Sequence, residues 1–280
     1  MLNGEKILVT GPAGRIAEPL CQYLAPHNEV WGIARFSEEG SRQRVEGHGV
    51  TTRLCDLGDG QFDGLPDDFT IVLHIAAFLG GSADYDEALR VNAEGTGLLL
   101  QHCRKAKAVL VMSTGSVYKP HPDPWHAYHE TDPLGEDALP AQPTYSISKI
   151  AEEAVARTSA RTLGLPIVIA RMNAAYGEKG AGLQGAHLEQ VLAGQPVTVR
   201  WDPCPYSPIA QDDINAQLEA ILSAASTPAT VVNWGGDEAV SPQQWCAFFA
   251  ELAGVEARVV VQEVPGAKRG VVVDGRGREI

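Results

Sequence analysis

The sequence contains few cysteines, and they follow no pairing pattern. Five occur among 280 residues, an odd number with wide spacing and no CxxC pair. This composition disfavours a disulfide framework and a zinc ribbon, and it fits a reducing cytoplasm. We expect all five thiols to be small apolar groups of the core.

Long apolar runs and an excess of positive charge are also missing. No run approaches the roughly 20 apolar residues that cross a bilayer. The opening stretch MLNGEKILVTG lacks the apolar segment of a secretory signal. Lysine and arginine number 22 against 35 acidic residues, which gives a formal net charge of -13 and disfavours binding to nucleic acid. We therefore expect a cytoplasmic protein that binds neither nucleic acid nor membrane.

Short apolar runs alternate with helix-like stretches through the first half of the chain. The runs are rich in Val, Ile and Leu without strict alternation, which predicts strands that are covered on both faces. Strand–helix–strand repetition predicts a doubly wound parallel α/β sheet of the Rossmann type. The expected strands are 6–10, 29–34, 50–55, 70–75, 108–113 and 166–171, and the expected helices are 16–24, 84–107 and 143–163.

After about residue 174 the pattern loosens into shorter elements with more glycine and proline. We expect helices near 213–225 and 242–252, and strands near 230–233 and 258–261. The chain is therefore divided into a dinucleotide-binding domain with the catalytic helix, residues 1–174, and a smaller substrate-binding lobe, residues 175–280. The lobe is expected to interleave with the main domain and not to follow it as a separate unit.

The segment TGPAGRIA, residues 10–17, lies between the first expected strand and the first helix. Glycine at positions 11 and 14 permits a tight turn and lets the backbone approach a pyrophosphate. The helix N-terminus that follows offers free N–H groups and positive dipole to the anion. The expected cofactor contacts here are Gly11, Ala13, Gly14, Arg15 and Ile16.

The end of the second expected strand indicates how the adenosine ribose is bound. The segment 33–36 reads IARF and has no acid to bind the ribose hydroxyls. Arg35 can instead pair with a 2′-phosphate, and Arg15 can reach the same group, so NADP(H) is favoured over NAD. The alternative is that Arg35 is merely solvated. Asp56 either meets the adenine amino group or caps a turn.

Tyr145 and Lys149 stand four residues apart on an expected helix, which places them on one face. A nearby ammonium stabilises phenolate and lowers the pKa of the tyrosine. This pair alone is common in proteins. Hydroxyls in the preceding segment STGS, residues 113–116, can polarise a substrate carbonyl and make a catalytic role more specific.

Taken in order, these motifs resemble those of the extended short-chain dehydrogenase/reductase family, of the epimerase/dehydratase type. The resemblance covers nearly the whole chain. The motifs are TGPAGRIA at 10–17, Asp56-Leu57, His74-Ile75-Ala76-Ala77, VNAEGT at 91–96, STGSVY at 113–118, Tyr145 with Lys149, RMNAAYG at 171–177 and QDDI at 211–214.

The resemblance implies hydride transfer between a nicotinamide and a hydroxyl or carbonyl carbon of a small molecule. It assigns general acid–base catalysis to Tyr145, pKa tuning and ribose binding to Lys149, and orientation of the reacting oxygen to Thr114. It also implies a homodimer formed by helices near 90–105 and 145–160. Further implied cofactor contacts are Leu57, Ala76, Ala77, Asn92 and Ser113, and implied substrate contacts are Phe78, Ser116, Asn173 and Arg200.

Several departures from the family pattern bear on the substrate. Asn173 comes one residue before the usual asparagine, where Ala174 stands. Tyr206 stands near the usual phosphate-binding arginine, for which Arg200 is a possible substitute. Gly115 and Ser116 replace the acid pair of sugar-nucleotide dehydratases, which disfavours dehydration. The chain also stops where relatives continue, so the pocket is expected to be smaller.

Three functions are compatible with these residues. An NADP-dependent oxidoreductase is favoured by Arg35, and a nucleotide-sugar epimerase or reductase that keeps NAD bound is favoured by the family. A non-catalytic cofactor sensor is disfavoured by the intact catalytic residues. A histidine-rich loop with His121, His126 and His129 raises a metal site as an alternative, but a solvated or substrate-contacting loop is favoured and no metal is expected.

Overall fold

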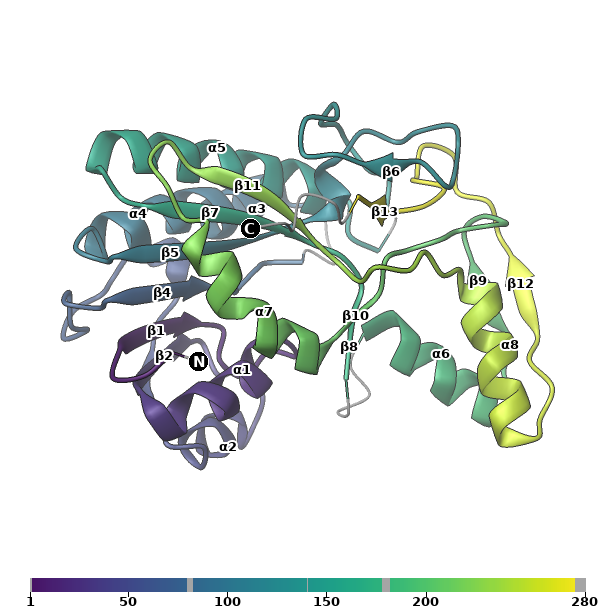
Figure 1. The fold of residues 1–280 in the computed structure, drawn as a ribbon, viewed down its shortest axis with the longest axis horizontal. Helices are drawn as coiled ribbons and strands as arrows, with labels where there is room; N and C mark the ends of the chain where they lie inside the picture. Colours follow the sequence, from purple (N-terminus) through teal and green to yellow (C-terminus); the bar gives the residue numbers. More distant parts are fainter. Residues whose placement is uncertain (1, 80–82, 140, 178–181, 275–280) are drawn as a thin grey trace.

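A seven-stranded parallel sheet forms the centre of the computed structural model, which describes residues 2–79, 83–139, 141–177 and 182–274 (Figure 1). Its order is β11-β7-β5-β4-β1-β2-β3, so the direction of winding reverses between β1 and β4. The predicted doubly wound sheet is confirmed. The strands are β1 (Lys6–Thr10), β2 (Glu29–Ala34), β3 (Thr51–Leu54), β4 (Ile71–His74), β5 (Ala108–Thr114), β7 (Ile167–Met172) and β11 (Thr230–Trp234).

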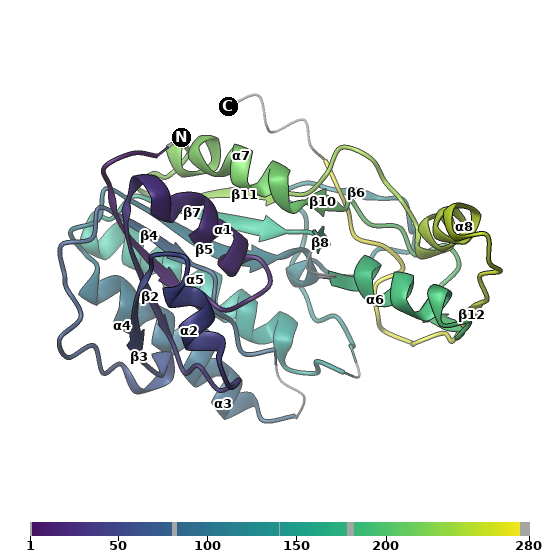
Figure 2. The ribbon, with the colours of Figure 1, turned by 90° about the horizontal axis from the view of Figure 1, so that it is seen from below.

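Helices cover both faces of the sheet (Figure 2). Alternate side chains of a strand point to opposite faces, so Ile7 packs with the helices of one layer and Leu8 with those of the other. This two-sided burial explains why the strands are continuously apolar. One layer holds α1 (Ala17–Leu24), α2 (Ser41–Glu46) and α7 (Gln211–Ser223), and the other holds α3 (Tyr85–Leu89), α4 (Gly95–His102) and α5 (Tyr145–Leu163).

The helix predicted over 84–107 is interrupted and shorter. Asp84 caps α3 by accepting a hydrogen bond from the N–H of Glu87, a π-helical turn η3 (Arg90–Glu94) follows, and α4 ends at His102. At the start of α4, a Cβ on Gly95 would lie 2.8 Å from the carbonyl oxygen of Leu57. Glycine therefore lets α4 approach the loop after β3.

A smaller lobe lies to the right of the sheet in Figure 1. Its own core joins Val191, Val197, Trp245 and Cys246. The sequence did not predict α6, because its glycines and glutamines obscure the helical pattern. The lobe contains α6 (Gly182–Leu192), α8 (Pro242–Ala253), β9 (Val197–Val199) and β12 (Val259–Val261).

Segments of the second half also return to the main sheet. The strand β11 pairs in parallel with β7, and α7 packs on the sheet through Ile214 and Leu218. The short strand β6 (Ala127–Tyr128) pairs with β13 (Val272–Val273) and so joins the two halves. Within the second half, β8 (Ala175–Tyr176) pairs with β10 (Ile209–Ala210). Three-residue 3₁₀ turns are η1 (Ala25–His27), η2 (Leu57–Asp59) and η4 (Gly115–Val117). Over the described residues, no helix combines the length and apolarity that a membrane span requires.

The central strand β5 supplies a direct test of this core. Leu110 has no exposed surface, so Leu110→Ala should lower the free energy of unfolding by about 2–5 kcal/mol through lost burial and a cavity. Leu252→Ala on α8 is the control, because that side chain is 72 % exposed and should change stability by less than about 0.5 kcal/mol. Urea unfolding measures both; equal effects would contradict the packing.

Candidate active site

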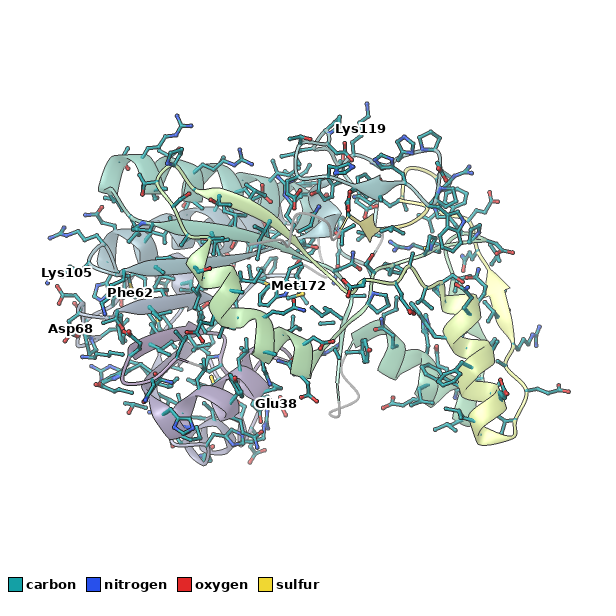
Figure 3. The ribbon with its side chains drawn as sticks, in the orientation of Figure 1. Glu38, Phe62, Asp68, Lys105, Lys119 and Met172 are labelled. Atoms are coloured by element: carbon teal, nitrogen blue, oxygen red, sulfur yellow. The ribbon has the colours of Figure 1, made fainter. Side chains whose placement is uncertain are left out.

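A cleft of about 720 Å³ opens at the carboxyl ends of the central strands, where the direction of winding reverses. Open parallel sheets bind their ligands at this position. Glu38 and Met172 both line the cleft. Figure 3 labels the two residues, Glu38 beside the N-terminal helices and Met172 at the end of β7. Fifteen predicted residues line it: Gly11, Ala13, Gly14, Arg15, Ile16, Arg35, Asp56, Leu57, Ala76, Ala77, Phe78, Ser113, Thr114, Tyr145 and Asn173.

The turn between β1 and α1 is shaped for close backbone approach. Gly11 has φ of +65°, and a Cβ there would lie 3.2 Å from Ala76. Ile16 is the N-cap of α1, and no side chain caps that end of the helix. The first N–H groups of a helix have no partner within it, so this turn can hold the pyrophosphate of a dinucleotide.

Buried hydrogen bonds fix the loop opposite that turn. The hydroxyl of Thr10 accepts from the N–H groups of Ile75 and Ala76 at 3.0 and 2.9 Å, and it lies 2.9 Å from His74 Nδ1. Thr96 donates to the carbonyl of Asn92 at 2.6 Å, so its oxygen accepts from His74 Nε2 at 2.7 Å. His74 therefore carries its proton on Nε2, and burial followed by the charge of Lys149 lowers its pKa to about 3. It is a neutral structural residue.

The adenosine end of the cleft combines exposed cations with a capped turn. Arg35 and Arg15 are exposed at its rim, while Glu38 lines the cleft further along the chain. Asp56 accepts from the N–H of Gly58 at 2.9 Å, so it caps η2 as well as lining the cleft. Both readings of Asp56 made from the sequence are compatible with this position.

The predicted catalytic residues meet between β5 and α5. Thr114 ends β5, Tyr145 begins α5, and the two side chains form a hydrogen bond. Lys149 is fully buried one turn along α5, and its Nζ donates to the carbonyl of Met112 at 2.7 Å. Burial is the largest influence on Tyr145 and leaves its pKa raised, although Lys149 and the bond from Thr114 act to lower it. This arrangement can exchange a proton with a hydroxyl or carbonyl oxygen in the cleft.

A second buried charge pair holds the same helix against the sheet. Arg171 on β7 donates to both carboxylate oxygens of Glu153, at 2.9 and 2.7 Å. Ser113 donates to the same carboxylate at 2.6 Å. Burial tends to raise the pKa of Glu153, but these partners outweigh it and lower the pKa. Ser113 is engaged in this way, whereas the Thr114 hydroxyl forms a hydrogen bond with Tyr145.

Four predicted residues lie outside the cleft wall among the described residues: Lys149, Asn92, Ser116 and Arg200. The amide of Asn92 is committed to both backbone groups of Phe78 and to the hydroxyl of Ser148. Ser116 offers its carbonyl to Lys268 Nζ at 2.8 Å, and Arg200 donates to the Tyr206 hydroxyl at 2.7 Å.

Asn173 lines the cleft, but its amide is already engaged. It donates to the carbonyl of Val271 at 2.7 Å and accepts from the N–H groups of Ala174 and Ser207. The shift of this asparagine by one residue therefore has a structural use: it anchors the last described segment of the chain beside the site. Its predicted contact with substrate stays a prediction.

Two buried carboxylates at the site, Glu152 and Glu153, were not predicted, although both follow Lys149 at helical spacing. A buried ion pair between Lys268 and Asp137, 3.3 Å apart, was not predicted either. In the histidine-rich loop, His126 Nε2 lies 2.7 Å from Asp132. Within the described ranges, no group of three or more potential ligands could hold a metal ion.

Known proteins share this sequence pattern. Residues 7–202 match the model of the NAD dependent epimerase/dehydratase family. A probable dTDP-glucose 4,6-dehydratase from Sinorhizobium fredii is 29% identical over 61% of this chain and 54% of its own length, so the match spans about half of that relative. An uncharacterized UDP-glucose epimerase from Bacillus subtilis, YtcB, is 24% identical over 90% of this chain and 83% of its own.

Solved structures share the fold. The UDP-glucuronic acid 4-epimerase of Bacillus cereus, in complex with UDP-4-deoxy-4-fluoro-glucuronic acid and NAD, superposes with a TM-score of 0.83 and 25% identity. The UDP-glucose 4-epimerase of Thermus thermophilus, in complex with NAD, gives 0.80 and 25%. Each match covers 97% of this chain and 91% of the other. Because the matched sequence contains both the glycine turn and the acid–base pair, we conclude that the chain belongs to the NAD-dependent epimerase/dehydratase family of enzymes.

Proposed function

We propose that the protein binds a nicotinamide dinucleotide in the cleft and transfers hydride at a hydroxyl-bearing carbon of a sugar nucleotide. The observation that carries this proposal is the group of Thr114, Tyr145 and Lys149 at the carboxyl end of β5. The glycine turn, with its uncapped helix end and its close approach to Ala76, suits a pyrophosphate. The bound cofactor would supply the hydride acceptor and donor.

The residues of the chain account for the proton. Tyr145, as phenolate, would take the proton of the substrate hydroxyl as the carbon is oxidised, and would return it on reduction. Thr114 would donate a hydrogen bond to the reacting oxygen and fix its position. Lys149 stabilises the phenolate by its charge, which is consistent with its lowering of the Tyr145 pKa.

Epimerisation or simple oxidoreduction is favoured over dehydration. Elimination of water needs an additional acid or base at the reacting carbon, and the residues after Thr114 are Gly115 and Ser116. Space is limited as well, because a Cβ on Gly115 would lie 2.5 Å from Val271. The Bacillus cereus epimerase was crystallised with a UDP-sugar and NAD, and the Thermus thermophilus epimerase was crystallised with NAD. These complexes support a sugar nucleotide as the substrate class.

An NADP-dependent reductase is the second candidate. Arg35 and Arg15 are exposed at the adenosine rim, and the segment 33–37 contributes no carboxylate. A guanidinium in this position can pair with a 2′-phosphate. Three expectations stay predictions: the boundary of the substrate lobe at residue 175, a homodimer formed through α4 and α5, and a cytoplasmic location.

Removal of one phenolic oxygen tests the acid–base assignment. Tyr145→Phe should lower turnover by about 100-fold or more, because it removes the proposed acid–base group, while affinity for the cofactor changes little. Turnover is followed by NMR detection of epimers or oxidised sugar from UDP-glucose and UDP-glucuronic acid. Tyr23→Phe on α1 is the control and should keep full activity. An active Tyr145→Phe enzyme would contradict the mechanism.

Substitution at the rim tests the cofactor. Arg35→Ala should weaken NADPH binding about tenfold, through loss of a charge-assisted hydrogen bond, and should leave NADH binding unchanged. Calorimetric titration with both nucleotides measures this, with the exposed Arg104→Ala as control. Equal effects on both nucleotides would refute phosphate binding by Arg35. A wild-type preference for NADPH would favour the reductase, and a preference for NADH the epimerase.

A further inference from the structure

A second carboxylate, Glu152, contacts Lys149 inside the protein. It stands three residues after Lys149 on α5 and has no exposed surface. One carboxylate oxygen forms a close ion pair with Lys149 Nζ, and the other lies 3.4 Å from His74 Nε2 on β4. The cleft lining does not include it, so the proposed proton transfer leaves this group without a role.

The packing around Glu152 shows that Lys149 is its principal partner. The ionisable groups that face it from the described elements are His74 on β4, and Tyr145, Lys149 and Glu153 on α5. His74 is neutral, and Glu153 is already neutralised by Arg171 on β7. Within the described part of the chain, neither oxygen of Glu152 accepts a well-aligned hydrogen bond, and the hydroxyl of Thr96 is an uncharged polar neighbour.

Burying an ionised carboxylate with so few partners costs free energy of folding, which points to a role for its contact with Lys149. An ionised group in the interior needs a charge partner and full hydrogen bonding to offset its lost hydration. Glu153, its neighbour in sequence, has both, from Arg171 and Ser113. The charge partner of Glu152 is the ammonium of Lys149, which also lies beside Tyr145, and the hydroxyl of Thr96 adds a weaker contact.

We propose that Glu152 is a positioning residue that holds the Lys149 ammonium against β5 and offsets part of its charge, and thereby sets the pH at which Tyr145 ionises. The inference rests on the proposed role of Tyr145 as the base. In addition, the ammonium of Lys149 interacts with two groups. The carboxylate of Glu152 holds it in place, and the ionisation of Tyr145 depends on its charge.

The electrostatic directions agree with this geometry. Burial raises the pKa of Glu152 to about 7, against the opposing effect of Lys149. The charge of Glu152 raises the pKa of Tyr145, whereas Lys149 lowers it. Ionised Glu152 therefore disfavours the phenolate, and neutral Glu152 leaves the full charge of Lys149 to favour it.

Glu152→Gln keeps the shape of the side chain and removes its charge. The ring-carbon NMR signal of Tyr145 in protein with ¹³Cζ-labelled tyrosine, assigned by its loss in Tyr145→Phe, should titrate about one pH unit lower than in wild type. Glu152→Asp, which keeps the charge, should titrate close to wild type. The exposed acid Glu94 provides the matched control, Glu94→Gln, with no shift expected.

The titration is made on the full chain without cofactor or substrate. A failure to turn over sugar nucleotides would therefore refute the proposed function and leave this measurement unaffected. An unchanged or higher Tyr145 midpoint in Glu152→Gln would overturn the inference. If Glu152→Gln does not fold, the same titration is made on Glu152→Ala, where a lower Tyr145 midpoint supports the inference and an unchanged or higher midpoint overturns it.

Discussion

The buried ammonium of Lys149 is the interaction on which the candidate site depends. It is fully buried, donates to the carbonyl of Met112 on β5 and pairs with Glu152 on its own helix. This contact ties the start of α5 to the end of β5. Tyr145 and Thr114, which lie at those two ends, are consequently within hydrogen-bonding distance of each other at the cleft.

A second tie acts further along the same helix. Glu153 joins α5 to β7 through Arg171 and to β5 through Ser113. A broken buried pair leaves an uncompensated charge, which makes such contacts sensitive to change. Two adjacent carboxylates on one helix thus have different surroundings. Glu153 pairs with Arg171 and accepts a hydrogen bond from Ser113, while Glu152 contacts Lys149.

Much of this architecture follows from local sequence. Continuous Val, Ile and Leu runs predict the parallel sheet, since each strand is buried on both faces. Gly11 and Gly14 predict the dinucleotide turn because they directly follow a strand. The meeting of Thr114 and Tyr145 is also predictable, because strand ends and helix starts lie at one edge of a parallel sheet.

The remaining features depend on tertiary contacts that no local pattern encodes. The amide of Asn92 is occupied by Phe78 and Ser148, which lie elsewhere in the sequence. The burial of Glu152 and Glu153 is equally hidden, because acidic residues on a helix ordinarily face water. Asn173 was expected to meet substrate, but its bonds to Val271 and Ser207 come from the folded-back chain.

A crystal structure with a bound nicotinamide dinucleotide tests the central claim most directly. The account predicts the pyrophosphate over the turn at Gly11 and Gly14, and the nicotinamide ring beside Thr114 and Tyr145. A dinucleotide bound outside the cleft, or one whose nicotinamide ring points away from Tyr145, would contradict it.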